Sequence, residues 1–304
     1  MKYSVVITSF NSKSSVKKAI ESFLHQTLEP EEIIVIDDFS QDGTWTVLNK
    51  INQKYSKLRV FRNSKNYGQS YSRNLGVQYA KSSIVVFGDD DDISLPTRAA
   101  LHLRQFKNKT DIDFVSSRKI YSSKYAIAAK NSKLAVTTLE IKEFGRKLLL
   151  GTDYKSLNLF VPASTCAVRK KSFVAVGGYD NNLRRLEDID LALKFSANGY
   201  KFSFNPNIAV YRYHSIGTHK GGAIDPSFQE KLLLKYASLF NANELSESIT
   251  AARLRGLYFS HKYLILTMKI LSDYVVLKIV LKKFKVILNR IYHDFTIRKN
   301  KSLC

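Results

Sequence analysis

Apolar and polar residues follow two different periods over the first hundred residues. Residues 3–8 and 32–37 are continuous runs rich in Val and Ile, which is typical of strands buried on both faces of a parallel sheet. Between these runs, Val16, Ile20 and Phe23 recur at helical spacing behind candidate capping serines. The pattern predicts a strand, a helix and a second strand, in that order.

The same alternation continues along the chain. Residues 57–63 and 82–88 indicate further strands, and residues 70–80 between them indicate a helix. Strands that alternate with helices predict a parallel α/β sheet with right-handed crossovers. The later pattern is less regular, and it predicts strands at 113–120, 164–170 and 208–214, with a helix that ends at Gly199. We expect one α/β domain over residues 1–220, followed by a helical region over residues 221–304.

Three polar clusters stand at the carboxyl ends of predicted strands. They are residues 8–11, the pair Asp37 and Asp38, and the four consecutive acids at 89–92. Ligands of parallel α/β sheets bind outside the carboxyl ends of the strands. We therefore expect these clusters to converge on one binding site.

The four acids at 89–92 directly follow the apolar stretch 84–87. Adjacent negative charges repel one another, and a strand or turn does not require them. Mg²⁺ and Mn²⁺ prefer hard oxygen ligands, and they often bind one or two carboxylates together with substrate phosphates. Asp89 and Asp91 are therefore candidate metal ligands. The alternative is a solvated acidic loop.

The pair Asp37 and Asp38 ends another predicted buried strand. A carboxylate at this place can accept a hydrogen bond from a nucleotide base or from a ribose hydroxyl. The alternative is a turn, because the following residues suit one with Asx capping. No glycine-rich phosphate-binding motif follows the first strand, which argues against dinucleotide-binding and P-loop proteins.

Charge and composition bear on partners and location. The chain has 304 residues and a net charge of +22, so the folded protein should attract an anionic partner. Its two cysteines have no metal-ligand spacing, which favours a reducing compartment. The apolar run at the N-terminus is too short for a signal peptide, and we expect a cytoplasmic protein.

The basic charge is concentrated in residues 251–304. This segment holds twelve Lys or Arg and two Asp, a net charge of +10 in 54 residues, with apolar residues in between. Uncharged runs such as 263–268 are far shorter than the roughly 20 residues that span a bilayer. The pattern predicts basic amphipathic helices that lie on an anionic membrane surface. Packing on the protein itself or on a second subunit is the alternative, so a homo-oligomer stays open.

Six ordered motifs together resemble the signature of glycosyltransferase family 2. They are "VVITSFN", "IIVIDDFSQDGT", "NYGQSYSRNLGV", "FGDDDDISLP", "VGGYD" and "LEDIDLALKF". The resemblance covers about residues 3–220. It implies a GT-A fold, which is a Rossmann-like α/β fold with a mostly parallel sheet, followed here by the basic C-terminal extension.

The resemblance also implies roles for individual residues. Thr8, Phe10 and Asn11 would line the nucleotide pocket, and Asp38 or Asp37 would bind the base or the ribose. Arg73 would lie near the diphosphate or the acidic loop, unless it is a surface residue of its helix. Asp89 and Asp91 match the D-x-D metal motif, and Asp90 is kept as an alternative because the run of four acids leaves the register open.

Two further residues carry chemistry by the same resemblance. Asp188 matches the catalytic base, which would take the proton of the acceptor hydroxyl. The alternative is an acidic helix start favoured by the helix dipole. His214 would approach the metal or the diphosphate, with His219 as a weaker candidate, although a lone histidine is often structural.

Together these observations predict a metal-dependent, inverting glycosyltransferase of the hexosyl or N-acetylhexosaminyl class. Its cofactor would be Mn²⁺ or Mg²⁺, its donor a nucleotide-sugar with UDP favoured, and its acceptor a saccharide or lipid-linked precursor of a surface polysaccharide or glycolipid. The enzyme would lie on the inner face of the cell membrane. The alternatives are a metal-dependent nucleotidyltransferase and a nucleic-acid-binding protein; the acids in the α/β half argue against nucleic acid, because they would repel a polyanion.

Overall fold

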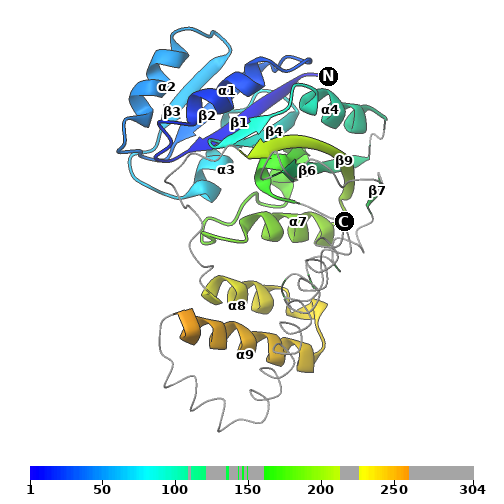
Figure 1. Cartoon of the computed structure of the whole chain (residues 1–304). Helices are drawn as coiled ribbons and strands as arrows, with labels where there is room; N and C mark the ends of the chain where they lie inside the picture. The colour runs from blue at the N-terminus through cyan, green and yellow to red at the C-terminus, as the bar shows by residue number, and fades with distance from the viewer. Residues whose placement is uncertain are drawn as a thin grey trace, which may run out of the picture. The chain divides into compact units, whose positions relative to one another are not determined.

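The computed structural model describes residues 1–108, 111–120, 135–136, 143, 146, 149, 161–212 and 226–259. The chain divides into two compact units, Met1–Gly221 and Gly222–Cys304. The first unit is an α/β domain built on one sheet (Figure 1). The mostly parallel α/β architecture predicted from the sequence is confirmed.

Nine described strands form the sheet, with β7 pairing to β9 outside the main order β3-β2-β1-β4-β8-β6-β9-β5. The strands are β1 Tyr3–Ser9, β2 Glu32–Asp37, β3 Leu58–Arg62, β4 Ile84–Asp89, β5 Asp92–Ser94, β6 Ile112–Ile120, β7 Ala135–Val136, β8 Cys166–Arg169 and β9 Lys201–Arg212. β3, β2, β1 and β4 run parallel, as do β6 and β9. β8 is antiparallel to both of its neighbours, so it joins the two parallel parts.

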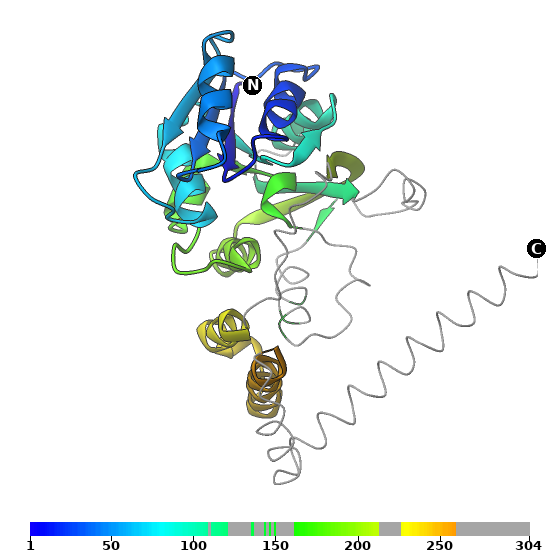
Figure 2. The same ribbon diagram turned by 60° about the vertical axis from the view of Figure 1, so that its left-hand side comes forward.

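Helices cover both faces of this sheet (Figure 1 and Figure 2). The described α-helices of the first unit are α1 Val16–Leu24, α2 Thr44–Asn52, α3 Gln69–Tyr79, α4 Arg98–Asn108, α6 Lys170–Ala175 and α7 Glu187–Ala197. Apolar residues of α1, α2 and α4 share one buried cluster with alternate residues of the central strands. α3 and α7 lie on the other side of the sheet (Figure 1).

The central strands are buried on both faces, which explains their continuous apolar runs. Every residue of β1 and β2 is buried. On one face Ile20 and Phe23 of α1 join the core cluster of the strands. On the other face α3 comes so close that a Cβ at Gly76 would lie 2.4 Å from a methyl carbon of Val6. A larger residue at position 76 would therefore push the helix off the sheet.

The carboxyl ends of β1, β2 and β4 meet at one edge, because these strands are parallel neighbours. In register, Thr8 of β1 lies beside both Ile36 of β2 and Asp89 of β4. Just beyond the strands, the backbone N–H of Asp38 donates to the carbonyl of Ser9 at 2.8 Å. The three polar clusters of the sequence therefore converge, as predicted.

In the second unit, α8 Pro226–Lys235 and α9 Ala242–Phe259 pack against each other and are joined through the short 3-10 helix Ala237–Leu239. An ion pair between Arg253 and Glu230, at 2.6 Å, links the two helices. No described helix combines the length and apolarity needed to cross a membrane. Most of the basic segment 251–304 lies outside the described residues, as does His214 with the weaker candidate His219.

Candidate active site

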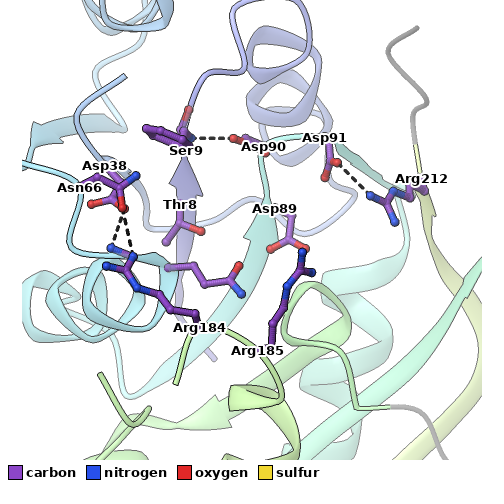
Figure 3. Close-up of a pocket in the computed structure, with 13 residues that line it drawn as sticks. Thr8, Ser9, Asp38, Asn66, Asp89, Asp90, Asp91, Arg184, Arg185 and Arg212 are labelled. Atoms are coloured by element: carbon purple, nitrogen blue, oxygen red, sulfur yellow. Dashed lines mark hydrogen bonds and ion pairs between the residues drawn. The ribbon is translucent and has the colours of Figure 1, made fainter. Parts of the chain in front are cut away.

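A cavity of about 510 Å³ opens at the carboxyl ends of β1, β2 and β4 (Figure 3). Its lining comes from all three strand ends, from the start of α3 and the loop before it, from the loop before α7 and from the end of β9. The lining residues are Thr8, Ser9, Phe10, Asp38, Asn66, Gly68, Gln69, Asp89, Asp90, Asp91, Arg184, Arg185 and Arg212. Six residues predicted from the sequence are among them: Thr8, Phe10, Asp38, Asp89, Asp90 and Asp91. A volume of this size is typical of small-molecule and cofactor sites.

The consecutive acids at the end of β4 face different partners. Oxygen atoms of Asp89, Asp91 and Asp92 all lie within 4.8 Å of one another. Asp90 turns elsewhere and accepts a hydrogen bond from the backbone N–H of Phe10 at 2.9 Å, which ties the loop after β4 to the loop after β1. Asp89, Asp90 and Asp91 all line the cavity, but the group of carboxylates close enough to share a metal ion includes Asp89 and Asp91 and leaves out Asp90.

Asp89 is held by a buried arginine. Arg73 Nη2 lies 3.0 Å from Asp89 Oδ1, and Arg73 Nη1 lies 2.9 Å from Glu187 Oε1. Burial opposes ionisation of Asp89, but the charges of Arg73 and Lys119 outweigh it and lower the pKa of Asp89. Asp89 is therefore a carboxylate at neutral pH. Arg73 is buried next to the acidic loop and is not a surface residue of its helix.

Asp38 organises the wall opposite the acids. Its carboxylate accepts hydrogen bonds from the side-chain amide of Asn63 and from the backbone N–H groups of Tyr67 and Gly68, at 2.8 to 2.9 Å. Two of these donors bind Oδ1 and one binds Oδ2. A carboxylate has about four acceptor positions, and the described residues fill three of those on Asp38, which leaves one on Oδ2.

Two predicted nucleotide ligands lie away from the cavity lining. Asp37 is fully buried, where it accepts hydrogen bonds from Ser40 and lies 3.3 Å from Arg62. Burial raises the pKa of Asp37. Asn11 has φ +48° and accepts a hydrogen bond from the backbone of Gln41. Both residues brace the loops after β1 and β2, because the short polar side chains point back into the turns instead of into the cavity.

Asp188 is the second residue of α7. It follows Glu187 directly and is half-buried at the start of α7, but it is not among the cavity-lining residues. Burial, together with the charge of Glu187, raises the pKa of Asp188 to about 7. Its neighbour Asp190 forms an ion pair with Lys194, 3.3 Å away on the same helix. Asp188 therefore combines a position near the Arg73 network with a proton affinity suited to chemistry at neutral pH.

Comparison with known families adds to this geometry. A model of the family described as "Glycosyl transferase family 2" matches residues 4–177, which is more than half of the chain. The chain belongs to glycosyltransferase family 2. The matched segment contains Asp38, Arg73 and the acidic run, whereas α7 with Asp188 lies beyond it.

Two curated relatives and one solved structure illustrate the similarity. A glycosyltransferase from Haemophilus influenzae is 28% identical over 63% of this chain and 60% of its own length. An Escherichia coli protein named UDP-Glc:alpha-D-GlcNAc-diphosphoundecaprenol beta-1,3-glucosyltransferase WfaP is 32% identical over 40% of this chain and 43% of its own length. The chain thus spans less than two thirds of these family members. Crystalline S. aureus TarS 1–349 with UDP-GlcNAc has a TM-score of 0.64 at 18% identity, covering 85% of this chain and 73% of that one, which confirms the GT-A fold.

In this family 2 chain, sequence reasoning missed the arginines of the cavity. Among the described residues, Arg184, Arg185 and Arg212 line it. Arg184 donates to Asn66 at 3.1 Å, and Arg212 lies 3.5 Å from Asp91. In Figure 3 the Arg185 side chain points toward Asp89. The available signal was the Arg-Arg pair directly before "LEDIDL", since guanidinium groups are suited to binding phosphate oxygens.

Gly68 gives a test of the wall that Arg184 forms. Its φ of +94° and ψ of 162° suit only glycine, and a Cβ would lie 2.4 Å from Arg184 Nη1. In Gly68→Ala, Arg184 must move away from Asn66. We expect the donor KM to rise about tenfold, the loss of one charge-assisted contact, as measured by initial rates.

Gly177→Ala is the matched control for this variant. Gly177 also has a positive φ, +78°, but a Cβ there would meet no atom within 4 Å. Both variants should lose about 1 to 3 kcal/mol of stability through backbone strain, and only Gly68→Ala should lose donor affinity. Equal donor KM values in the two variants would show that the contact between Gly68 and Arg184 does not shape the donor site.

Proposed function

We propose that this chain is a metal-dependent, inverting glycosyltransferase. Its donor would be a nucleoside-diphosphate sugar, most simply a UDP-sugar, and its acceptor a saccharide or a lipid-linked saccharide. The observation that carries the proposal is the cavity itself, which sets the carboxylates of Asp89 and Asp91 beside the guanidinium groups of Arg185 and Arg212. A metal-bridged diphosphate requires both kinds of group.

The names of similar proteins support the choice of donor and acceptor. WfaP is named for a UDP-glucose donor and a diphosphoundecaprenol acceptor, which is a lipid carrier. The solved structure with the same fold contains UDP-GlcNAc. These names favour a UDP-sugar and a lipid-linked acceptor in surface polysaccharide or glycolipid synthesis.

The oxygen ligands that Asp89 and Asp91 offer fit a divalent cation. Asp89 and Asp91 supply hard oxygen ligands on the cavity wall, and their oxygens lie within 4.8 Å of each other. A single Mg²⁺ with ligands at about 2.1 Å spans about 4.2 Å between opposite oxygens, so small side-chain movements suffice. When bound, Mg²⁺ or Mn²⁺ would offset the negative charge that develops on the leaving diphosphate.

The chain's own residues would carry the other steps. Asp38 offers its remaining acceptor position to the base or the ribose, and the three cavity arginines attract the diphosphate. Asp188 would accept the proton of the acceptor hydroxyl as that oxygen attacks the anomeric carbon. Attack opposite the leaving nucleotide inverts the configuration of that carbon.

Release of nucleotide from a panel of donors tests the proposal. The purified protein would be incubated with Mn²⁺ and UDP-glucose, UDP-galactose, UDP-GlcNAc or UDP-GalNAc, with and without a lipid-linked saccharide. We expect UDP release from one or two of these donors, which would also separate the hexosyl from the N-acetylhexosaminyl class. Pyrophosphate as the product would instead show a nucleotidyltransferase.

The basic segment 251–304 motivates a proposal about location, namely that it holds the enzyme on the inner face of an anionic membrane. Each basic residue near such a surface contributes about 1 kcal/mol. The full-length variant Lys278→Gln, Lys282→Gln, Lys283→Gln, Lys285→Gln should therefore bind anionic liposomes at least about 100-fold more weakly than the unmodified protein in a sedimentation assay.

A second fourfold variant controls for net charge. Lys17, Lys18, Lys50 and Lys54 are exposed on or beside α1 and α2. Their replacement by Gln changes the net charge equally and should leave liposome binding within about threefold. Equal losses in the two variants would assign the binding to overall charge and not to the C-terminal segment. A salt-sensitive shift of DNA or RNA would favour the nucleic-acid alternative.

A further inference from the structure

Each carboxylate in the metal-competent cluster has its own cation. Asp89 pairs with Arg73 at 3.0 Å, Asp91 lies 3.5 Å from Arg212, and Asp92 pairs closely with Lys119. The three pairs differ in burial. The Asp91 and Arg212 side chains are 18% and 33% exposed, whereas those of Asp92 and Lys119 are 4% and 5% exposed.

The buried pair is built into the sheet behind the cavity. Asp92 begins β5, Lys119 belongs to β6, and both strands pair with β9, where Asp92 lies opposite Arg212 and Lys119 opposite Val210. Lys119 Nζ also donates to Ser164 Oγ at 3.2 Å. Unlike Asp89 and Asp91, Asp92 does not line the cavity.

One oxygen of Asp92 stands out. Oδ2 takes the Lys119 contact, while Oδ1 is buried and has no hydrogen-bond partner in the part of the chain that the structure describes. A buried carboxylate oxygen without a partner, within 4.8 Å of oxygens from Asp89 and Asp91, is a ready third ligand for a cation. The ammonium group of Lys119 beside it opposes that use, because it repels a second positive charge and would lose its buried partner if Asp92 moved.

We propose that Lys119 is a positioning residue that restricts the metal site to Asp89 and Asp91 by holding Asp92 as its own counter-ion. The inference rests on the proposed function, because it concerns the cation of that site. Restricting the protein ligands to two carboxylates leaves coordination positions for diphosphate oxygens. It also favours Mg²⁺ and Mn²⁺ over Ca²⁺, which takes more oxygen ligands at longer distances.

Removing the ammonium group tests this restriction. In Lys119→Met, Asp92 loses its counter-ion and its unpartnered oxygen becomes available to a cation. We expect Mn²⁺ to bind at least about tenfold more tightly, with a larger gain for Ca²⁺, since affinity rises with the number of charged ligands. The readout is direct titration of Mn²⁺ by its electron paramagnetic resonance signal, and of Ca²⁺ by calorimetry, without any turnover.

The double variant Lys119→Met, Asp92→Asn separates restraint from ligation. It removes both charges of the pair, and replacing a buried ion pair by neutral residues is commonly tolerated, so this variant should fold. We expect its Mn²⁺ affinity to lie within about threefold of the unmodified protein. A loss of tenfold or more would show that Asp92 is a ligand in the native site and would overturn the proposal, as would unchanged or weaker Mn²⁺ binding by folded Lys119→Met.

The outcomes also separate this inference from the proposed function. If the unmodified protein binds Mn²⁺ but releases UDP equally well in EDTA, the metal-dependent function fails, while the Mn²⁺ affinities of the variants still decide the role of Lys119. If neither protein binds Mn²⁺, both fail. If circular dichroism shows that Lys119→Met is unfolded, the double variant alone tests the proposal. Its Mn²⁺ affinity would fall only if Asp92 were a third metal ligand in the unmodified protein.

Discussion

Asp91→Asn should lower UDP-sugar turnover at least about 100-fold, because a bound metal contributes several kcal/mol to stabilising the leaving diphosphate. Asp91 lines the cavity and its oxygens lie within 4.8 Å of those of Asp89. Its cation partner, Arg212, is 3.5 Å away and partly exposed, so the substitution leaves no buried charge without a partner. Initial rates at saturating Mn²⁺ and calorimetric binding of UDP with Mn²⁺ would both report the loss.

Asp111→Asn is the control for this experiment. Asp111 directly precedes β6, and it is an exposed acid that pairs with Lys201. Its replacement by Asn removes the same charge as Asp91→Asn without changing the cavity. Its turnover should match that of the unmodified protein. Full activity of Asp91→Asn, or full activity of the unmodified protein in EDTA, would contradict the metal assignment at Asp89 and Asp91.

The central part of the fold could be predicted because each element had a local signal. β1, β2 and β4 are buried on both faces, so their apolar runs are continuous. The helix α7 ends at Ala197, two residues before Gly199, whose φ of +73° lies outside the helical region. The antiparallel placement of β8 between β4 and β6 had no such signal. Strand direction depends on where the chain goes between strands, and no local pattern encodes it.

The helix α2, Thr44–Asn52, was not predicted, although Leu48 and Ile51 are buried in the core. It begins after Gly43 in the left-handed conformation, and the residues before it read as an extended turn. The backbone N–H of Thr44 donates to the carboxylate of Asp42, and the hydroxyl of Thr44 accepts a hydrogen bond from the backbone N–H of Ser12. The helix start is thus fixed by a contact with the loop after β1, which is a tertiary contact.

The site could be predicted where a side chain follows directly from the end of a strand. Asp38 and Asp89 end or follow buried strands, and both line the cavity. The sequence could not show which of two adjacent polar residues faces the cavity, because only the backbone geometry decides this. Asp37 is buried and contacts Ser40 and Arg62, while Asp38 lines the cavity. Arg184 and Arg185 come from the loop before α7 and Arg212 from the end of β9, all more than 90 residues after the acidic run, so their approach depends on the whole fold.

A buried network connects the donor side of the site to α7. Arg73 bridges Asp89 of β4 and Glu187 of α7, and Gln69 also donates to Glu187. Burial and the neighbouring charge of Glu187 together raise the pKa of Asp188 to about 7. Arg73 therefore acts on both carboxyl groups: it keeps Asp89 a carboxylate, and it holds Glu187 beside Asp188 while its own positive charge partly offsets the rise in the pKa of Asp188.

Asp188→Asn should lower kcat about 100- to 10,000-fold, the usual range for loss of a general base, while donor affinity stays within about twofold. The pH dependence gives a second readout. Asp188 can accept a proton only when ionised, so kcat of the unmodified protein should rise with pH through about 7. The variant's small residual rate should lack this rise, as measured by pH profiles of kcat at saturating donor.

Asp190→Asn is the matched control, because Asp190 lies on the same helix and pairs with Lys194. It should keep the rise in kcat near pH 7.

The raised pKa of Asp188 also affects the free energy of unfolding. Protonated Asp188 stabilises the folded state; this contribution is fully present below pH 4 and is lost as the pH rises through about 7. Activity and stability should therefore change in opposite directions between pH 6 and 8 in the unmodified protein. If Asp188→Asn instead lost donor affinity and kept its turnover at saturation, Asp188 would belong to the donor site and the base would have to be sought elsewhere.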